Sequence, residues 1–139
     1  MLTMSTQVKE RLIAHARRVY PLEACGIVAG PAGSGRAVRV VEMANALGHP
    51  RRFQFDPHEQ LRVWRRMDEL GEQPVVIYHS HPTTAPVPSR TDIAGATEPG
   101  AVYVIVSLRD PARPKVKAWK MPAAGPVEEP INLIEGDAS

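Results

Sequence analysis

The stretch VVIYHSHPTTAPVPSRTD, residues 75–92, decides how this 139-residue chain is organised. It begins with four residues typical of a buried strand, because the run does not alternate with polar residues. The run leads directly into His-Ser-His at 79–81, although the chain has only five histidines. Pro82 then ends the strand pairing. A proline-rich loop and Ser-Arg-Thr-Asp, residues 89–92, complete the stretch. We therefore predict a buried strand that carries polar side chains at its C-terminal end.

The order of helical and strand segments around this stretch predicts an α/β domain in which helices pack on a mixed sheet. The length of the chain predicts a single domain, residues 1–139. Asp56, followed by a proline and a glutamate, is expected to cap a helix that Gly71 ends. We expect other helices at 6–20 and 89–97, strands at 24–30, 36–47, 74–81, 101–108 and 114–121, and a flexible connection at 122–130 before a terminal segment at 131–134.

Composition narrows the function classes. The 17 basic and 15 acidic residues give a net charge of +2, which does not suggest a nucleic-acid partner. The single cysteine excludes an intrachain disulfide and favours a reducing compartment. No apolar stretch has the length of a signal peptide core or a membrane span. We therefore expect a cytoplasmic protein without membrane contact.

His79 and His81 are two residues apart in the expected strand, so they project on the same side. Two imidazoles placed in this way can bind one zinc ion at about 2.0–2.1 Å, and a carboxylate commonly completes a catalytic site that leaves one position to water. Asp92 is the candidate, in the first turn of a helix that Ser89 would cap. Each piece alone is more often surface decoration or a plain capping box. Their combination favours a metal site.

A zinc-bound water needs a proton acceptor before it can act as a hydrolytic nucleophile, and Glu23 is the candidate. It follows a proline and directly precedes the expected strand at 24–30. A glutamate in such a position usually faces solvent, so only a nearby metal site favours the catalytic interpretation. Cys25, in the same stretch, is interpreted as a small core residue rather than a nucleophile.

Other polar and aromatic residues receive structural interpretations. We expect His15, His49 and His58 at the surface or in turns, Trp64 and Trp119 in packing positions, and Arg51, Arg52, Arg62, Arg65 and Arg66 on solvated faces, with a docking role left open.

The spacing of Glu23, then His-Ser-His-Pro at 79–82, six residues, Ser89, two residues and Asp92 resembles the signature of the JAMM (MPN-plus) zinc metalloproteases. The stretches EACGIVAG, FQFDPHEQLRVWRRM and EEPINLIE are similar to the small bacterial members that act on sulfur carriers, the CysO–cysteine peptidase group (Mec type). The resemblance covers roughly residues 7–135.

This resemblance implies a curved mixed sheet flanked by helices, with the cytidine-deaminase-like architecture of the family. It implies one zinc ion per chain, held by His79, His81 and Asp92, with Glu23 as general base and Ser89 stabilising the oxyanion. The implied reaction hydrolyses the amide between the C-terminal glycine of a ubiquitin-like sulfur carrier and cysteine. The flexible carrier tail would enter a groove in which the loop at 83–88 forms one wall.

Three alternatives remain open at this point. The chain could be an isopeptidase resembling a deubiquitinase, a protease that trims the C-terminus of a carrier, or a non-catalytic scaffold of the same fold. The intact set of five residues argues against the scaffold. The sequence does not identify the carrier or decide whether the chain forms a homodimer.

Overall fold

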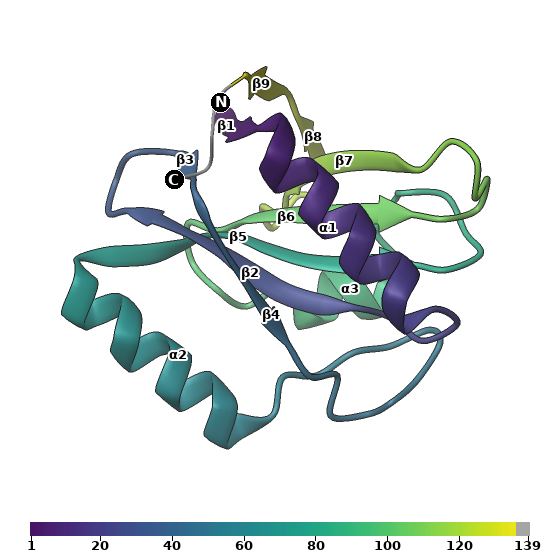
Figure 1. The fold of residues 1–139 in the computed structure, drawn as a ribbon, viewed down its shortest axis with the longest axis horizontal. Coiled ribbons are helices and arrows are strands. Elements are labelled where there is room, and N and C mark those ends of the chain that lie inside the picture. The colour runs from purple at the N-terminus through teal and green to yellow at the C-terminus, as the bar shows by residue number, and fades with distance from the viewer. Residues whose placement is uncertain (136–139) are drawn as a thin grey trace.

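The computed structural model describes residues 1–135, which form nine strands and three helices. Figure 1 shows their arrangement. In chain order they are β1 (Leu2–Ser5), α1 (Thr6–Val19), β2 (Cys25–Pro31), β3 (Arg36–Ala37), β4 (Arg39–Met43), α2 (Pro57–Leu70), β5 (Glu72–His81), α3 (Arg90–Gly95), β6 (Val102–Ser107), β7 (Lys115–Lys120), β8 (Val127–Glu129) and β9 (Ile131–Ile134). Within this part of the chain, no helix is long and apolar enough to cross a membrane.

The main sheet has six strands in the order β4-β2-β5-β6-β7-β8. Only β5 and β6 run parallel, and the chain connects them through α3; every other neighbouring pair is antiparallel. The predicted α/β class with a mixed sheet is confirmed. Strand β5, which carries the decisive histidines, lies between β2 and β6, near the middle of the sheet.

The two long helices cover opposite faces of this sheet. Leu12 of α1 packs with Val28 and Val76 in one apolar cluster, and Met67 of α2 packs with Ile27 and Ile77 in the other. Figure 1 shows α1 across the near face, with α2 below. Because side chains alternate along a strand, His79 and His81 share the α2 face with Ile77.

A second sheet consists of three short, parallel strands in the order β3-β1-β9. The sequence did not predict β1, and the expected strand at 36–47 is divided into β3 and β4. Strand β8 also lies within the segment at 122–130, where we expected only a connection. Leu2 and Met4 of β1 are almost fully buried against α1, so this short strand is part of the core.

The expected surface position of His15 is wrong. His15 lies on the buried face of α1, and its Nδ1 is 2.7 Å from the hydroxyl of Tyr78, which is itself fully buried. A buried tyrosine hydroxyl requires a partner, and His15 provides it. Gly26 leaves space for the tyrosine, because a Cβ atom at Gly26 would lie 2.6 Å from the same hydroxyl oxygen.

The predicted ends of α2 are confirmed. Asp56 caps the helix by accepting hydrogen bonds from the backbone N–H groups of His58 and Glu59 at 2.9 and 3.0 Å. Gly71 ends it in the left-handed conformation, with a φ of 69°. The helix thus starts and stops where its local sequence specifies.

Candidate metal centre

Strand β5 places the side chains of His79 and His81 close together at its C-terminal end. Their Nε2 atoms lie 3.2 Å apart, and the two residues are only 1% and 5% exposed. The ring of His79 stacks on Phe53, with centroids 4.8 Å apart and planes 23° from parallel. This packing fixes the imidazole orientation.

Asp92 reaches the same point from α3. Its carboxylate oxygens lie 3.1 Å from Nε2 of His79 and 2.9 Å from Nε2 of His81. The backbone N–H of Ser89 donates to Asp92 Oδ2 at 2.9 Å, while the Ser89 hydroxyl accepts from the backbone N–H of Asp92 at 3.1 Å. Asp92 is therefore both a member of the capping box of α3 and a candidate metal ligand, and the cap orients its carboxylate.

The donor set fits a tetrahedral metal ion. One ligand atom from each of the three residues lies within 4.8 Å of the others. Ligands at about 2.05 Å in a tetrahedron lie about 3.3 Å from one another, close to the separations found here. His81 Nδ1 donates to the carbonyl oxygen of Ala85 at 2.8 Å. That bond orients the ring and leaves Nε2 of the neutral imidazole free to bind a metal.

Burial and charge set the protonation of these groups. Burial lowers the pKa of His79, which favours the neutral, metal-binding form. Burial would also lower the pKa of His81, but its hydrogen bonds to Asp92 and Ala85, together with the nearby carboxylates, raise the pKa overall. Burial alone would raise the pKa of Asp92, yet hydrogen bonds with both histidines hold it well below its ordinary value. Asp92 is therefore an anion at neutral pH.

Glu23 is brought to the centre by the antiparallel pairing of β2 with β5. The backbone N–H of Ala24 donates to the Ser80 hydroxyl at 2.7 Å, and the Ser80 N–H donates to the Ala24 carbonyl at 3.0 Å. Glu23 is 3% exposed, and its Oε1 has no hydrogen-bond partner within residues 1–135. Burial raises the pKa of Glu23 to about 8. Its charge interacts with those of His81 and Asp92, so it lies near the ligands.

A cavity of about 400 Å³ opens on this centre. Its wall includes His79, Asp92 and the apolar side chains of Phe53, Tyr103 and Met121. No residue of the loop at 83–88 lines this cavity, while Ala85 and Pro86 line a separate pocket of about 310 Å³. The loop contacts His81, whose Nδ1 donates a hydrogen bond to the Ala85 carbonyl.

The segment between β4 and α2, residues 44–56, is the part of the site that sequence reasoning missed. Besides Phe53, which stacks on His79, it contributes His49, whose carbonyl accepts from the Glu23 N–H at 3.0 Å. Asn45 holds this segment in place, because its side-chain amide donates to the carbonyls of Glu23 and Arg52 at 3.2 and 2.9 Å. In its sequence, Phe53 and Phe55 are the signal that could have indicated a packing role.

The structural interpretation of Cys25 is supported. The residue is fully buried, and burial raises the pKa of its thiol to about 12, so a thiolate is not formed at neutral pH.

The sheet and its group of two histidines and one aspartate define a fold and a candidate site that can be compared with those of known proteins. The model of the family described as prokaryotic homologs of the JAB domain matches residues 5–122. The chain belongs to this family, which confirms the resemblance read from its motif.

Several relatives and structures resemble the chain over most of its length. It is 47% identical over 135 residues to a protein of Mycobacterium tuberculosis named CysO-cysteine peptidase, covering 97% of this chain and 92% of the relative. It is 32% identical to a desampylase of Haloferax volcanii, covering 76% and 80%. A solution structure from Desulfitobacterium hafniense has a TM-score of 0.88 at 35% identity, covering 98% and 94%. A JAB1/MPN domain protein from Archaeoglobus fulgidus, with a TM-score of 0.65 at 16% identity and coverage of 96% and 97%, shares the fold.

Proposed function

We propose that this chain is a zinc-dependent peptidase that hydrolyses the amide between the C-terminal glycine of a ubiquitin-like sulfur carrier and cysteine, releasing cysteine. The relatives named peptidase and desampylase indicate a hydrolase, and the 47% identity to CysO-cysteine peptidases supports the narrower reaction. The observation that carries the proposal is the convergence of His79, His81 and Asp92 beside a buried, unpartnered Glu23.

We assign one zinc ion per chain to these three ligands, within a single catalytic domain over residues 1–139. When bound, zinc would supply a polarised water molecule and an electrophile for the scissile carbonyl. Glu23 accepts a proton from the attacking water, whose oxygen bonds to the acyl carbon. It then passes that proton to the nitrogen as the C–N bond breaks. Burial raises the pKa of Glu23, so its carboxyl group holds the transferred proton more readily than an exposed glutamate would.

We assign Ser89 to the oxyanion. Its hydroxyl oxygen already accepts from the Asp92 N–H, so the hydroxyl hydrogen is available for a second partner. A single donor of this kind typically contributes about 3 kcal/mol to a transition state. Because the capping box fixes Ser89 next to a metal ligand, the donor is positioned before the substrate arrives.

An isopeptidase that cuts a carrier from a lysine side chain is the second candidate, since two relatives named desampylase match at 32% and 27% identity. We place either activity in the cytoplasm, because Cys25, the only cysteine, is free and buried.

The deciding experiment incubates the zinc-loaded protein with four substrates and reads the products by mass spectrometry. These are a carrier–cysteine conjugate, a carrier–lysine isopeptide, a carrier with a short C-terminal extension, and di-ubiquitin. The proposal expects the first to have the highest kcat/KM. Faster cleavage of the isopeptide would favour the second candidate, and cleavage of none would reject both.

A further inference from the structure

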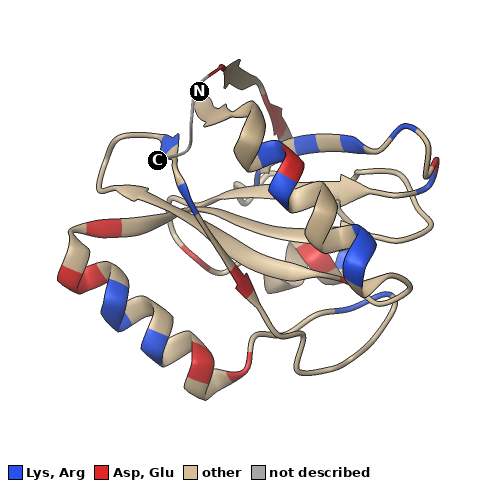
Figure 2. Ribbon diagram, viewed as in Figure 1, with Lys and Arg blue, Asp and Glu red and all other residues tan. Residues whose placement is uncertain are grey.

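A basic pocket adjoins the metal centre. It has a volume of about 560 Å³ and is lined by His49, Pro50, Arg51, Arg52 and Thr91. Thr91 also lines the cavity that contains His79 and Asp92, so the two cavities meet there. The proposed reaction gives this pocket no role. In Figure 2 the loop between β4 and α2 carries basic residues on the side of the molecule where α3 lies.

The two guanidinium groups of this pocket are available to a ligand. Within residues 1–135, the side chains of Arg51 and Arg52 make no hydrogen bond or salt bridge, and both residues are exposed. Three arginines elsewhere, Arg18, Arg39 and Arg66, are less available because each pairs with a glutamate. Two unpaired, adjacent arginines beside a cavity favour a planar anion, and a carboxylate matches the fork of a guanidinium.

The loop that carries these arginines is held in place by hydrogen bonds. The Asn45 side chain donates to the Arg52 carbonyl at 2.9 Å and accepts from the backbone N–H of Gln54 at 3.2 Å. His49 Nδ1 accepts from the Arg51 N–H at 3.0 Å, which places the hydrogen of the neutral ring on Nε2, a further donor. A ligand would therefore meet a largely preorganised pocket, with little ordering to oppose binding.

The position of Glu23 relates this pocket to the leaving-group half of the substrate. Its backbone N–H donates to the carbonyl oxygen of His49 at 3.0 Å, so the proposed proton donor adjoins the basic loop. Glu23 must approach the leaving amine to protonate it. A leaving amine beside Glu23 can extend toward Arg51 and Arg52, which leaves the cavity lined by Phe53 and Tyr103 for the acyl half.

We propose that Arg51 and Arg52 bind the free α-carboxylate of an amino-acid leaving group. This inference rests on the proposed function and sharpens it. In a free amino acid the carboxylate is separated from the scissile nitrogen by a single carbon, so a carboxylate pocket must lie next to the site of proton transfer. A lysine within a protein carries no carboxylate there. The pocket would thus select a single amino acid over a protein-linked lysine.

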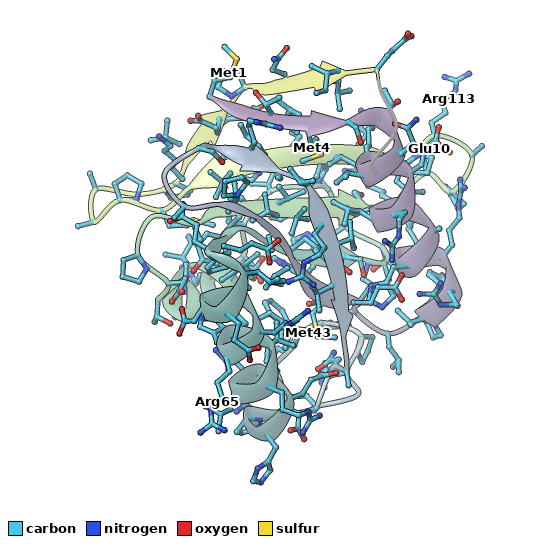
Figure 3. All side chains as sticks on the ribbon, turned by 60° about the vertical axis from the view of Figure 1, so that its left-hand side comes forward. Met1, Met4, Glu10, Met43, Arg65 and Arg113 are labelled. Atoms are coloured by element: carbon cyan, nitrogen blue, oxygen red, sulfur yellow. The ribbon has the colours of Figure 1, made fainter. Side chains whose placement is uncertain are left out.

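The test pairs two substrates with two variants. The substrates are carrier–cysteine and carrier–cysteinamide, which differ only in the charge of the carboxyl group. The variants are R51Q/R52Q and, as a control, R65Q, whose side chain lies on the exposed face of α2 and points away from the sheet (Figure 3). Melting temperature and zinc content establish that each variant is folded and loaded.

We expect the parent and R65Q to prefer the acid over the amide by about tenfold to a hundredfold in kcat/KM, the range of a charge-assisted hydrogen bond. R51Q/R52Q should lose that preference and cleave both substrates at the parental rate for the amide. Equal rates of the parent on acid and amide would overturn the inference while leaving the proposed function intact. A loss of equal size on both substrates in R51Q/R52Q would mean that the arginines dock the carrier surface instead.

Binding provides a measurement that does not depend on turnover. In a Glu23→Gln background, the Kd for the acid conjugate should be about tenfold to a hundredfold lower than for the amide. Adding R51Q/R52Q should remove that difference. Equal Kd values before the arginines are changed would also refute the inference. Cleavage of neither substrate by the zinc-loaded parent would instead reject the proposed function.

Discussion

Replacing Glu23 by glutamine separates the general base from the metal ligands. Glutamine keeps the size and polarity of the side chain but does not accept a proton from the attacking water. General acid–base groups typically contribute about 10²–10⁴-fold, and this one would serve both water attack and amine departure, so we expect the upper end of that range. The loss should fall on kcat, with zinc content and carrier binding nearly unchanged, because the side chain acts mainly in the transition state.

The same substitution has a predictable effect on stability. Burial raises the pKa of Glu23 from about 4.5 to about 8 in the folded, metal-free protein. Between these values the folded state binds more protons than the unfolded state, so stability falls as the pH rises through that window. At pH 7 the unfavourable contribution is on the order of 3 kcal/mol. Glu23→Gln removes it.

The assay is thermal unfolding with chelator present, from pH 4 to pH 8. Parent and Glu23→Gln should unfold at similar temperatures near pH 4. The variant should be more stable by roughly 10 °C at pH 7, the shift that about 3 kcal/mol produces in a chain of this length. A constant difference across the pH range would refute the assigned protonation of Glu23. Loss of zinc in the variant would make Glu23 a ligand, and retention of more than about a tenth of turnover would remove it from the mechanism.

Three further outcomes follow from the site and its scaffold. Asp92→Ala should lose most bound zinc in metal analysis, and chelator should abolish the activity of the parent until zinc is restored; full activity without zinc would contradict the metal assignment. Ser80→Ala leaves the backbone N–H before β2 without its acceptor, so it should lower the free energy of unfolding by about 1–3 kcal/mol and reduce kcat more than zinc content. Gly26→Ala would place a Cβ 2.5 Å from a backbone oxygen of β4 and should lower the free energy of unfolding by at least ~1–3 kcal/mol, whereas Gly95→Ala meets open space and should change it by less than about 0.5 kcal/mol. Equal effects of the two glycine substitutions in denaturant titration would show that close packing at Gly26 is not limiting.

The sequence by itself determined the local half of the site. The two-residue period of a strand places His79 and His81 on one side, and a capping box that spans four residues orients Asp92. The ends of α2 were likewise specified by Asp56 and Gly71. Each of these features involves residues only a few positions apart, whose geometry follows from backbone periodicity and local hydrogen bonds.

Only the tertiary structure decided what depends on pairing across the chain. Glu23 is buried rather than solvent-facing because β2 pairs with β5 in a register that Ser80 holds, 56 residues after Ala24. The short strand β1 depends on its pairing with β9. Four residues have too weak a local preference to specify a strand without a partner. Asn45 was predicted to lie in a strand at 36–47, but β4 ends at Met43. The Asn45 side chain instead donates to the carbonyls of Glu23 and Arg52 and so joins the basic loop to the candidate site. Those contacts depend on register and long-range hydrogen bonds, which no local pattern encodes.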